Sequence, residues 1–77
     1  MTIHDIQQLV GLQLGRTAVR PEDRLYEDLG AESMDLVNLA VAIEDRFDVF
    51  IPEEDLADLR TVYDLYALVH RHLDAPS

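Results

Sequence analysis

Hydrophobic residues recur at helical spacing along three long segments of the chain, and no segment of useful length alternates as a half-buried strand would. In the first segment, Thr2 and Asp5 stand where a capping box begins a helix. Leu14 is followed by Gly15, and glycine supplies the left-handed residue that ends helices. We therefore predict a first helix between these two signals. Its core-facing residues are predicted to be Ile3, Ile6, Leu9 and Val10.

A second helix is predicted to begin at about Ser33 and to end at Phe47 or Asp48, because Pro52 pushes the residue before it toward extended conformations. At about 100° per residue, one side forms a core-facing stripe. This stripe comprises Leu36, Leu39, Ala40, Ile43 and Phe47. The opposite side mixes apolar with polar and acidic residues: Met34, Val37, Asn38, Val41, Glu44 and Asp45. A helix in a monomer needs no second apolar stripe, so a docking surface is indicated, although single exposed Val or Met residues are also ordinary.

The segment between these helices, Arg16 to Ala31, is predicted to be a long loop, in which Pro21 stops any helix. Leu25 and Leu29 are apolar and spaced to tuck beneath it. A loop of this length inside so small a domain is usually functional or pinned by such anchors.

Two further helices are predicted near the C-terminus. Pro52 suits the first turn of a short helix, and the three carboxylates after it complement the helix dipole. Thr61 is predicted to cap a last helix, and residues 74–77 to fray. The stripe of this helix is predicted to be Val62, Leu65, Tyr66, Val69 and Leu73. The whole pattern predicts one all-α domain over residues 1–77, a small antiparallel four-helix bundle with a short third helix and a long loop between helices one and two.

Charge narrows the classes of partner. The chain has 16 Asp and Glu residues against 6 Lys and Arg, a net charge of −10, and no cysteine. Nucleic acid is excluded as a partner, because phosphate binding needs a positive footprint. Such acidity favours basic surfaces on partner proteins, although it can also serve only to keep a small protein in solution. Without a signal peptide or a membrane-spanning apolar run, we expect a cytoplasmic monomer that does not insert into membranes.

Ser33 is the candidate for chemistry, at the start of the predicted second helix and among carboxylates. A nucleophilic serine needs an oriented base within hydrogen-bond reach, but the three histidines, His4, His70 and His72, lie in the terminal helices. We therefore predict no catalytic residue. We also expect no metal site. His70 and His72 are two residues apart on the predicted last helix, so their side chains point in different directions and cannot bind one metal ion well. A purely structural alternative is that Ser33 only caps its helix.

The sequence around Ser33, Asp28-Leu29-Gly30-Ala31-Glu32-Ser33-Met34-Asp35-Leu36, resembles the attachment motif of acyl carrier proteins. Three later segments, residues 42–48, 51–54 and 61–64, resemble further parts of that family in the same order. The resemblance implies a covalent carrier without catalytic activity of its own. In it, Ser33 would receive 4'-phosphopantetheine from coenzyme A, and the thiol of this arm would carry an acyl group as a thioester.

The resemblance also implies partners, namely a phosphopantetheinyl transferase and acyl-processing enzymes with basic docking patches. An acyl chain would be sheltered between helices two and three. The residues implied in docking are Asp28, Glu32, Met34, Asp35, Val37, Val41, Glu44 and Asp45.

Three residues depart from the usual family pattern: Glu32, Asn38 and Phe50. They leave the pathway open among fatty acid, polyketide and related biosynthesis. An aminoacyl or peptidyl carrier of a specialised pathway is one alternative. Another is an unmodified module that only binds partner proteins.

Overall fold

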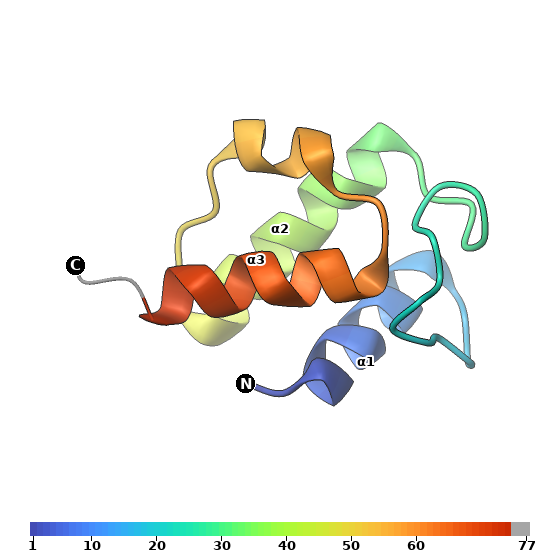
Figure 1. Cartoon of the computed structure of the whole chain (residues 1–77), viewed down its shortest axis with the longest axis horizontal. Coiled ribbons are helices and arrows are strands. Elements are labelled where there is room, and N and C mark those ends of the chain that lie inside the picture. Colours follow the sequence, from blue (N-terminus) through green and yellow to red (C-terminus); the bar gives the residue numbers. More distant parts are fainter. Residues whose placement is uncertain (75–77) are drawn as a thin grey trace.

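Three α-helices and one short 3₁₀-helix form the fold in the computed structural model, which describes residues 1–74 (Figure 1). The elements are α1 (Ile3–Leu14), α2 (Ser33–Phe47), η1 (Glu53–Asp58) and α3 (Val62–Asp74). Helix α1 packs against both α2 and α3, while η1 lies against α2. The predicted all-α fold with a long loop before the second helix is confirmed. Within residues 1–74, strand-like pairing is limited to a single bridge between Arg24 and Thr61.

The ends of α1 follow the local signals of the sequence. The Asp5 carboxylate accepts the backbone N–H of Thr2 at 2.9 Å, and the Thr2 hydroxyl accepts the N–H of Asp5 at 3.3 Å. The bond from the Thr2 backbone lowers the pKa of Asp5 below its ordinary value, with smaller contributions from the Thr2 hydroxyl and Arg46. Gly15 ends the helix with a φ of 68°, a left-handed conformation that costs glycine little.

Helix α3 begins as predicted, but its buried face differs in part. The Thr61 hydroxyl accepts the N–H of Asp64, and the Asp64 carboxylate accepts the N–H of Thr61, both at 3.1 Å. Leu68 is buried, whereas Leu73, predicted to face the core, is exposed near the C-terminal end of the helix. Fraying was predicted for residues 74–77. The prediction is wrong at Asp74, which is the last residue of α3. The other three positions, 75–77, lie outside the described residues.

The third predicted helix is a 3₁₀-helix, and Pro52 precedes it as the N-cap. Within η1 itself only Leu56 is buried, and Ile51 and Leu59 anchor the chain on either side. Six residues of 3₁₀-helix are near the upper limit for this conformation, because its hydrogen bonds are poorer than those of an α-helix.

The core lies between the three α-helices and includes the long loop. Leu25 and Leu29 are both buried there, so the prediction that they pin the loop is confirmed. On α2 the predicted core stripe is also confirmed, with Phe47 at its partly buried edge. The other fully enclosed side chains include Ile6, Val10, Leu39, Ile43, Val62, Leu65 and Val69. Within residues 1–74, no helix is long and apolar enough to cross a membrane.

Candidate functional site

Ser33 is the first residue of α2, and its side chain is exposed. The residue that caps the helix is Glu32, which has extended backbone angles. The Asp35 carboxylate accepts the Glu32 backbone N–H at 2.9 Å, and the Asp35 N–H donates to the Glu32 carbonyl at 2.9 Å. The reading of Ser33 as the cap is therefore wrong, because the helix begins one residue earlier than that role requires. Within the described residues 1–74, the Ser33 hydroxyl forms no hydrogen bond.

The turn before Ser33 is held by the loop anchors. Gly30 adopts a φ of 71°, which lets the chain reverse direction before the helix. The N–H of Gly30 donates to Tyr26 and that of Ala31 to Leu25, at 3.1 and 2.9 Å. Because Leu25 is fully buried, these bonds fix the backbone that presents Ser33.

The three histidines lie on other helices than Ser33. His4 is on α1, and His70 and His72 are on α3. The His72 Nε2 atom lies 3.1 Å from a carboxylate oxygen of Asp55 on η1. The histidines therefore lie on the terminal helices, as the sequence predicted.

A pocket of about 500 Å³ opens beside Ser33, between α2 and η1. We refer to it as the Ser33 pocket. Its lining is mainly apolar and includes the exposed residues Tyr26, Glu53 and Glu54. The residues on its two sides are Leu36 and Val37 from α2, and Leu56 and Ala57 from η1. Tyr26, Leu56 and Ala57 were not among the sequence-derived candidates. The tertiary contact of η1 with α2 brings Leu56 and Ala57 to the pocket, and the fold of the long loop brings Tyr26.

Six of the eight predicted docking residues fall into two groups by exposure. Met34 and Val41 are 65% and 57% exposed, and Glu32 and Asp45 are exposed carboxylates. Asp35 and Val37 are half-buried, Asp35 as part of the helix cap and Val37 at the Ser33 pocket.

Besides Asp35, which accepts the Glu32 N–H, two further predicted docking carboxylates already have partners. Asp28 accepts the Arg24 backbone N–H at 2.8 Å and its guanidinium at 3.2 Å, and the Arg24 side chain is the main cause that lowers the pKa of Asp28. Glu44 accepts the N–H of Ile51 at 2.8 Å and so secures the segment after α2. The negative surface open to a partner is therefore centred on Glu32 and Asp45.

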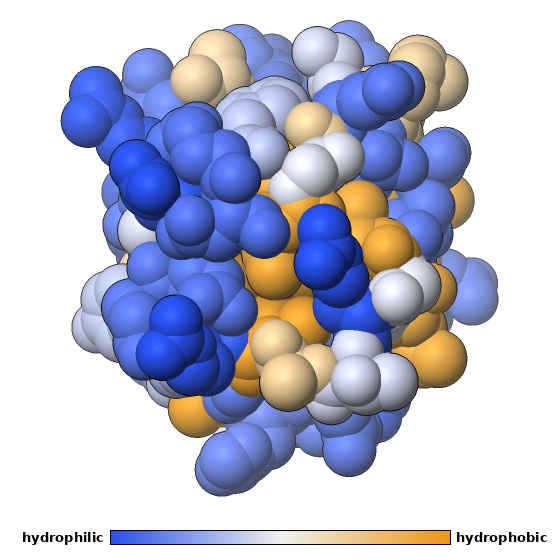
Figure 2. Space-filling view, turned by 90° about the vertical axis from the view of Figure 1, so that its right-hand side faces the viewer, coloured by the Kyte–Doolittle hydropathy of each residue, from blue (hydrophilic) through white to orange (hydrophobic). Residues whose placement is uncertain are grey.

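The surface at the loop end of the molecule combines apolar and hydrophilic residues. Figure 2 faces the side where the loop lies in Figure 1 and shows an apolar area framed by hydrophilic residues. Such a composition is typical of protein-binding surfaces.

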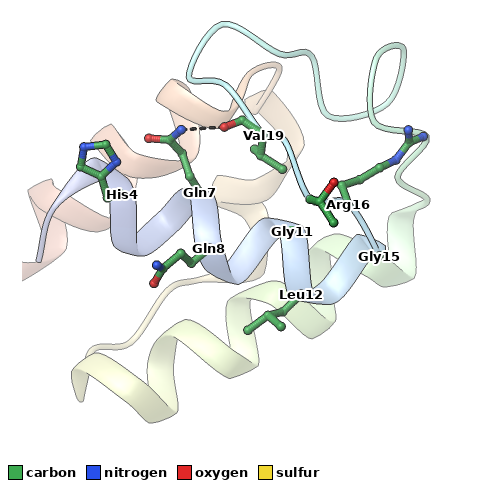
Figure 3. Close-up of a pocket in the computed structure, with 9 residues that line it drawn as sticks. His4, Gln7, Gln8, Gly11, Leu12, Gly15, Arg16 and Val19 are labelled. Carbon is green, nitrogen blue, oxygen red and sulfur yellow. Dashed lines mark hydrogen bonds between the residues drawn. The ribbon is translucent and has the colours of Figure 1, made fainter.

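A wider hollow of about 780 Å³ lies along α1, where the first loop residues cross the helix (Figure 3). The Gln7 amide donates to the Val19 carbonyl at 2.6 Å across it. Gly11 permits the crossing, since a Cβ there would lie 2.7 Å from the Arg16 carbonyl oxygen. This hollow has no residue in common with the Ser33 pocket.

Comparison with known proteins identifies the family. Residues 4–69 match the family model described as the phosphopantetheine attachment site. The chain is a member of the acyl carrier protein family. It is 43% identical over 63 residues to an acyl carrier protein of Syntrophobacter fumaroxidans, covering 79% of this chain and 78% of that one. It is 39% identical to the acyl carrier protein of Helicobacter hepaticus, covering 88% and 92%.

A solved structure agrees with this assignment. The crystal structure of an acyl carrier protein from Thermotoga maritima superimposes with a TM-score of 0.78 at 27% identity, covering 94% of this chain and 86% of that one. As a member of this family, the chain is a carrier of acyl groups without catalytic activity of its own. Its prosthetic group is 4'-phosphopantetheine, whose thiol holds the acyl group as a thioester. Its function requires contact with acyl-processing enzymes.

Proposed function

We propose that Ser33 is the residue to which 4'-phosphopantetheine is attached. The observation that carries this proposal is an exposed hydroxyl without a hydrogen-bond partner in residues 1–74, at the mouth of a pocket and at the start of a helix. The Ser33 oxygen forms a phosphoester with the phosphopantetheine of coenzyme A, and adenosine 3',5'-bisphosphate leaves. The hydroxyl proton passes to a base of the transferase, since no histidine of residues 1–74 lines the pocket at Ser33.

The attachment is tested by incubating the protein with coenzyme A and a broad-specificity phosphopantetheinyl transferase. Mass spectrometry is expected to show the addition of one phosphopantetheine to the wild type and none to Ser33→Ala. Thr17→Ala, which removes another exposed hydroxyl, serves as the matched control and should be modified like the wild type. An unchanged wild-type mass with several transferases would favour an unmodified interaction module instead.

We further propose that partners dock on the exposed face of α2. Met34 and Val41 supply apolar contact, and Glu32 and Asp45 face basic side chains of the partner. Asp35 and Val37 act at the edge of this surface. Asp28 and Glu44 contribute less, because Arg24 and the Ile51 backbone already engage them.

The pathway proposed for this carrier is fatty acid, polyketide or related biosynthesis, and an aminoacyl or peptidyl pathway is the alternative. We also propose that the protein works as a cytoplasmic monomer, where coenzyme A supplies the arm. The mass of the thioester on protein isolated from its native cell distinguishes the pathways, and an amino-acid mass would favour the alternative.

A further inference from the structure

The two walls of the Ser33 pocket differ in how firmly they are held. The α2 wall belongs to a 15-residue helix whose core stripe is buried. The other wall is η1, a six-residue 3₁₀-helix in which Leu56 is the buried side chain. Because 3₁₀-helices are individually weak, contacts with neighbouring elements decide how firmly η1 keeps its position.

A side-chain contact joins η1 to α3. His72 Nε2 lies 3.1 Å from Asp55 Oδ2, and the two side chains are 27% and 36% exposed. His72 lies in the last turn of α3. The contact is therefore a partly shielded hydrogen-bond contact between η1 and a long helix.

We propose that the Asp55–His72 contact is a latch that limits how far the Ser33 pocket opens for the cargo. This inference rests on the proposed attachment at Ser33. A two-carbon acyl group needs no displacement of η1, whereas a chain of eight carbons entering between Leu36 and Leu56 pushes η1 away from α2. Breaking the latch lowers the cost of that displacement, so the long chain enters more fully. Asp55 and His72 are positioning residues, since they act through the placement of η1.

The test compares two cargoes on the holo-protein. Octanoyl and acetyl thioesters are cleaved with hydroxylamine under identical conditions. In His72→Gln the octanoyl thioester should be cleaved roughly two- to five-fold more slowly than in the wild type, the range expected for loss of a partly exposed contact worth up to about 1 kcal/mol. The acetyl thioester should be cleaved at the wild-type rate. His4→Gln, which removes an exposed histidine from α1, should behave as the wild type with both cargoes.

Asp55→Asn and the double variant show whether the two residues act as a pair. For a latch, the double variant should slow octanoyl cleavage no further than either single variant. Additive effects, or an unchanged octanoyl-to-acetyl ratio in His72→Gln, would overturn the latch.

A measurement on the unloaded protein separates the latch from the attachment proposal. Amide hydrogen exchange at Leu56 and Ala57 should be faster in His72→Gln by the same two- to five-fold, with exchange in α1 unchanged. Unchanged exchange in η1 would overturn the latch even if Ser33 carries the arm. Failure to load the wild type at Ser33 would instead overturn the attachment proposal.

Discussion

Of the three glycines, Gly11 is the one where another stretch of backbone, at Arg16, comes closest. It is buried in the middle of α1, beneath the carbonyl of Arg16. A side chain at this position meets backbone, which cannot rotate away as the end of a side chain can. The close approach explains why a residue that weakens helices stands inside one.

We expect Gly11→Ala to destabilise the protein by about 1–3 kcal/mol, although alanine favours helices, because the loop backbone must shift. Chemical denaturation measures the change. Leu12→Ala on the same helix, at a side chain 80% exposed, should change stability by less than about 0.5 kcal/mol. A stabilised Gly11→Ala variant would show that the loop does not rest on α1.

Helix α2 has two faces with different tasks. Leu36, Leu39 and Ile43 bind it to the bundle, while Met34 and Val41 remain exposed on the other side. The periodicity of the sequence predicted both faces. It could not predict that Glu44 would bond to the Ile51 backbone or that Arg24 would engage Asp28, because these bonds depend on how the loop and the segment after α2 fold back.

The exposed face predicts a specific effect on partner binding. We expect Met34→Ala to raise the KM of the phosphopantetheinyl transferase for this protein about five-fold or more, because a buried apolar anchor of an interface is worth more than about 1 kcal/mol. The kcat should change little. Leu12→Ala, which removes an even more exposed apolar side chain from α1, should leave KM unchanged. Equal effects of the two variants would place the docking surface elsewhere.

Across the whole molecule, acidic charge is unevenly balanced. Arginines of the loop pair with its own carboxylates, as in the contacts of Arg20 with Glu22 and Asp23. Residues 48–58 contain five carboxylates and no Lys or Arg. Repulsion among these groups acts against the compact state, while the same field would favour the basic partner surfaces proposed above.

Added salt is therefore expected to raise the melting temperature, because screening weakens this repulsion. Each kcal/mol gained corresponds to about 4–8 °C in a domain of this size. Thermal unfolding followed by circular dichroism measures the change from low to high ionic strength. The variant Asp48→Asn with Asp58→Asn should melt higher at low salt and respond less to added salt. A melting temperature independent of ionic strength would contradict the expectation.

The sequence alone determined the helices and most of their ends, because Thr2, Gly15 and Thr61 act on backbone groups within one turn. It also determined which face of α2 is buried, since periodicity is a property of the single helix. Only the tertiary structure decided that Glu32 rather than Ser33 caps α2 and that η1 forms a wall of the Ser33 pocket. It also decided that Asp55 meets His72. The pocket wall and the Asp55–His72 contact depend on residues that are far apart in the chain. The cap depends on the turn that the loop imposes before α2.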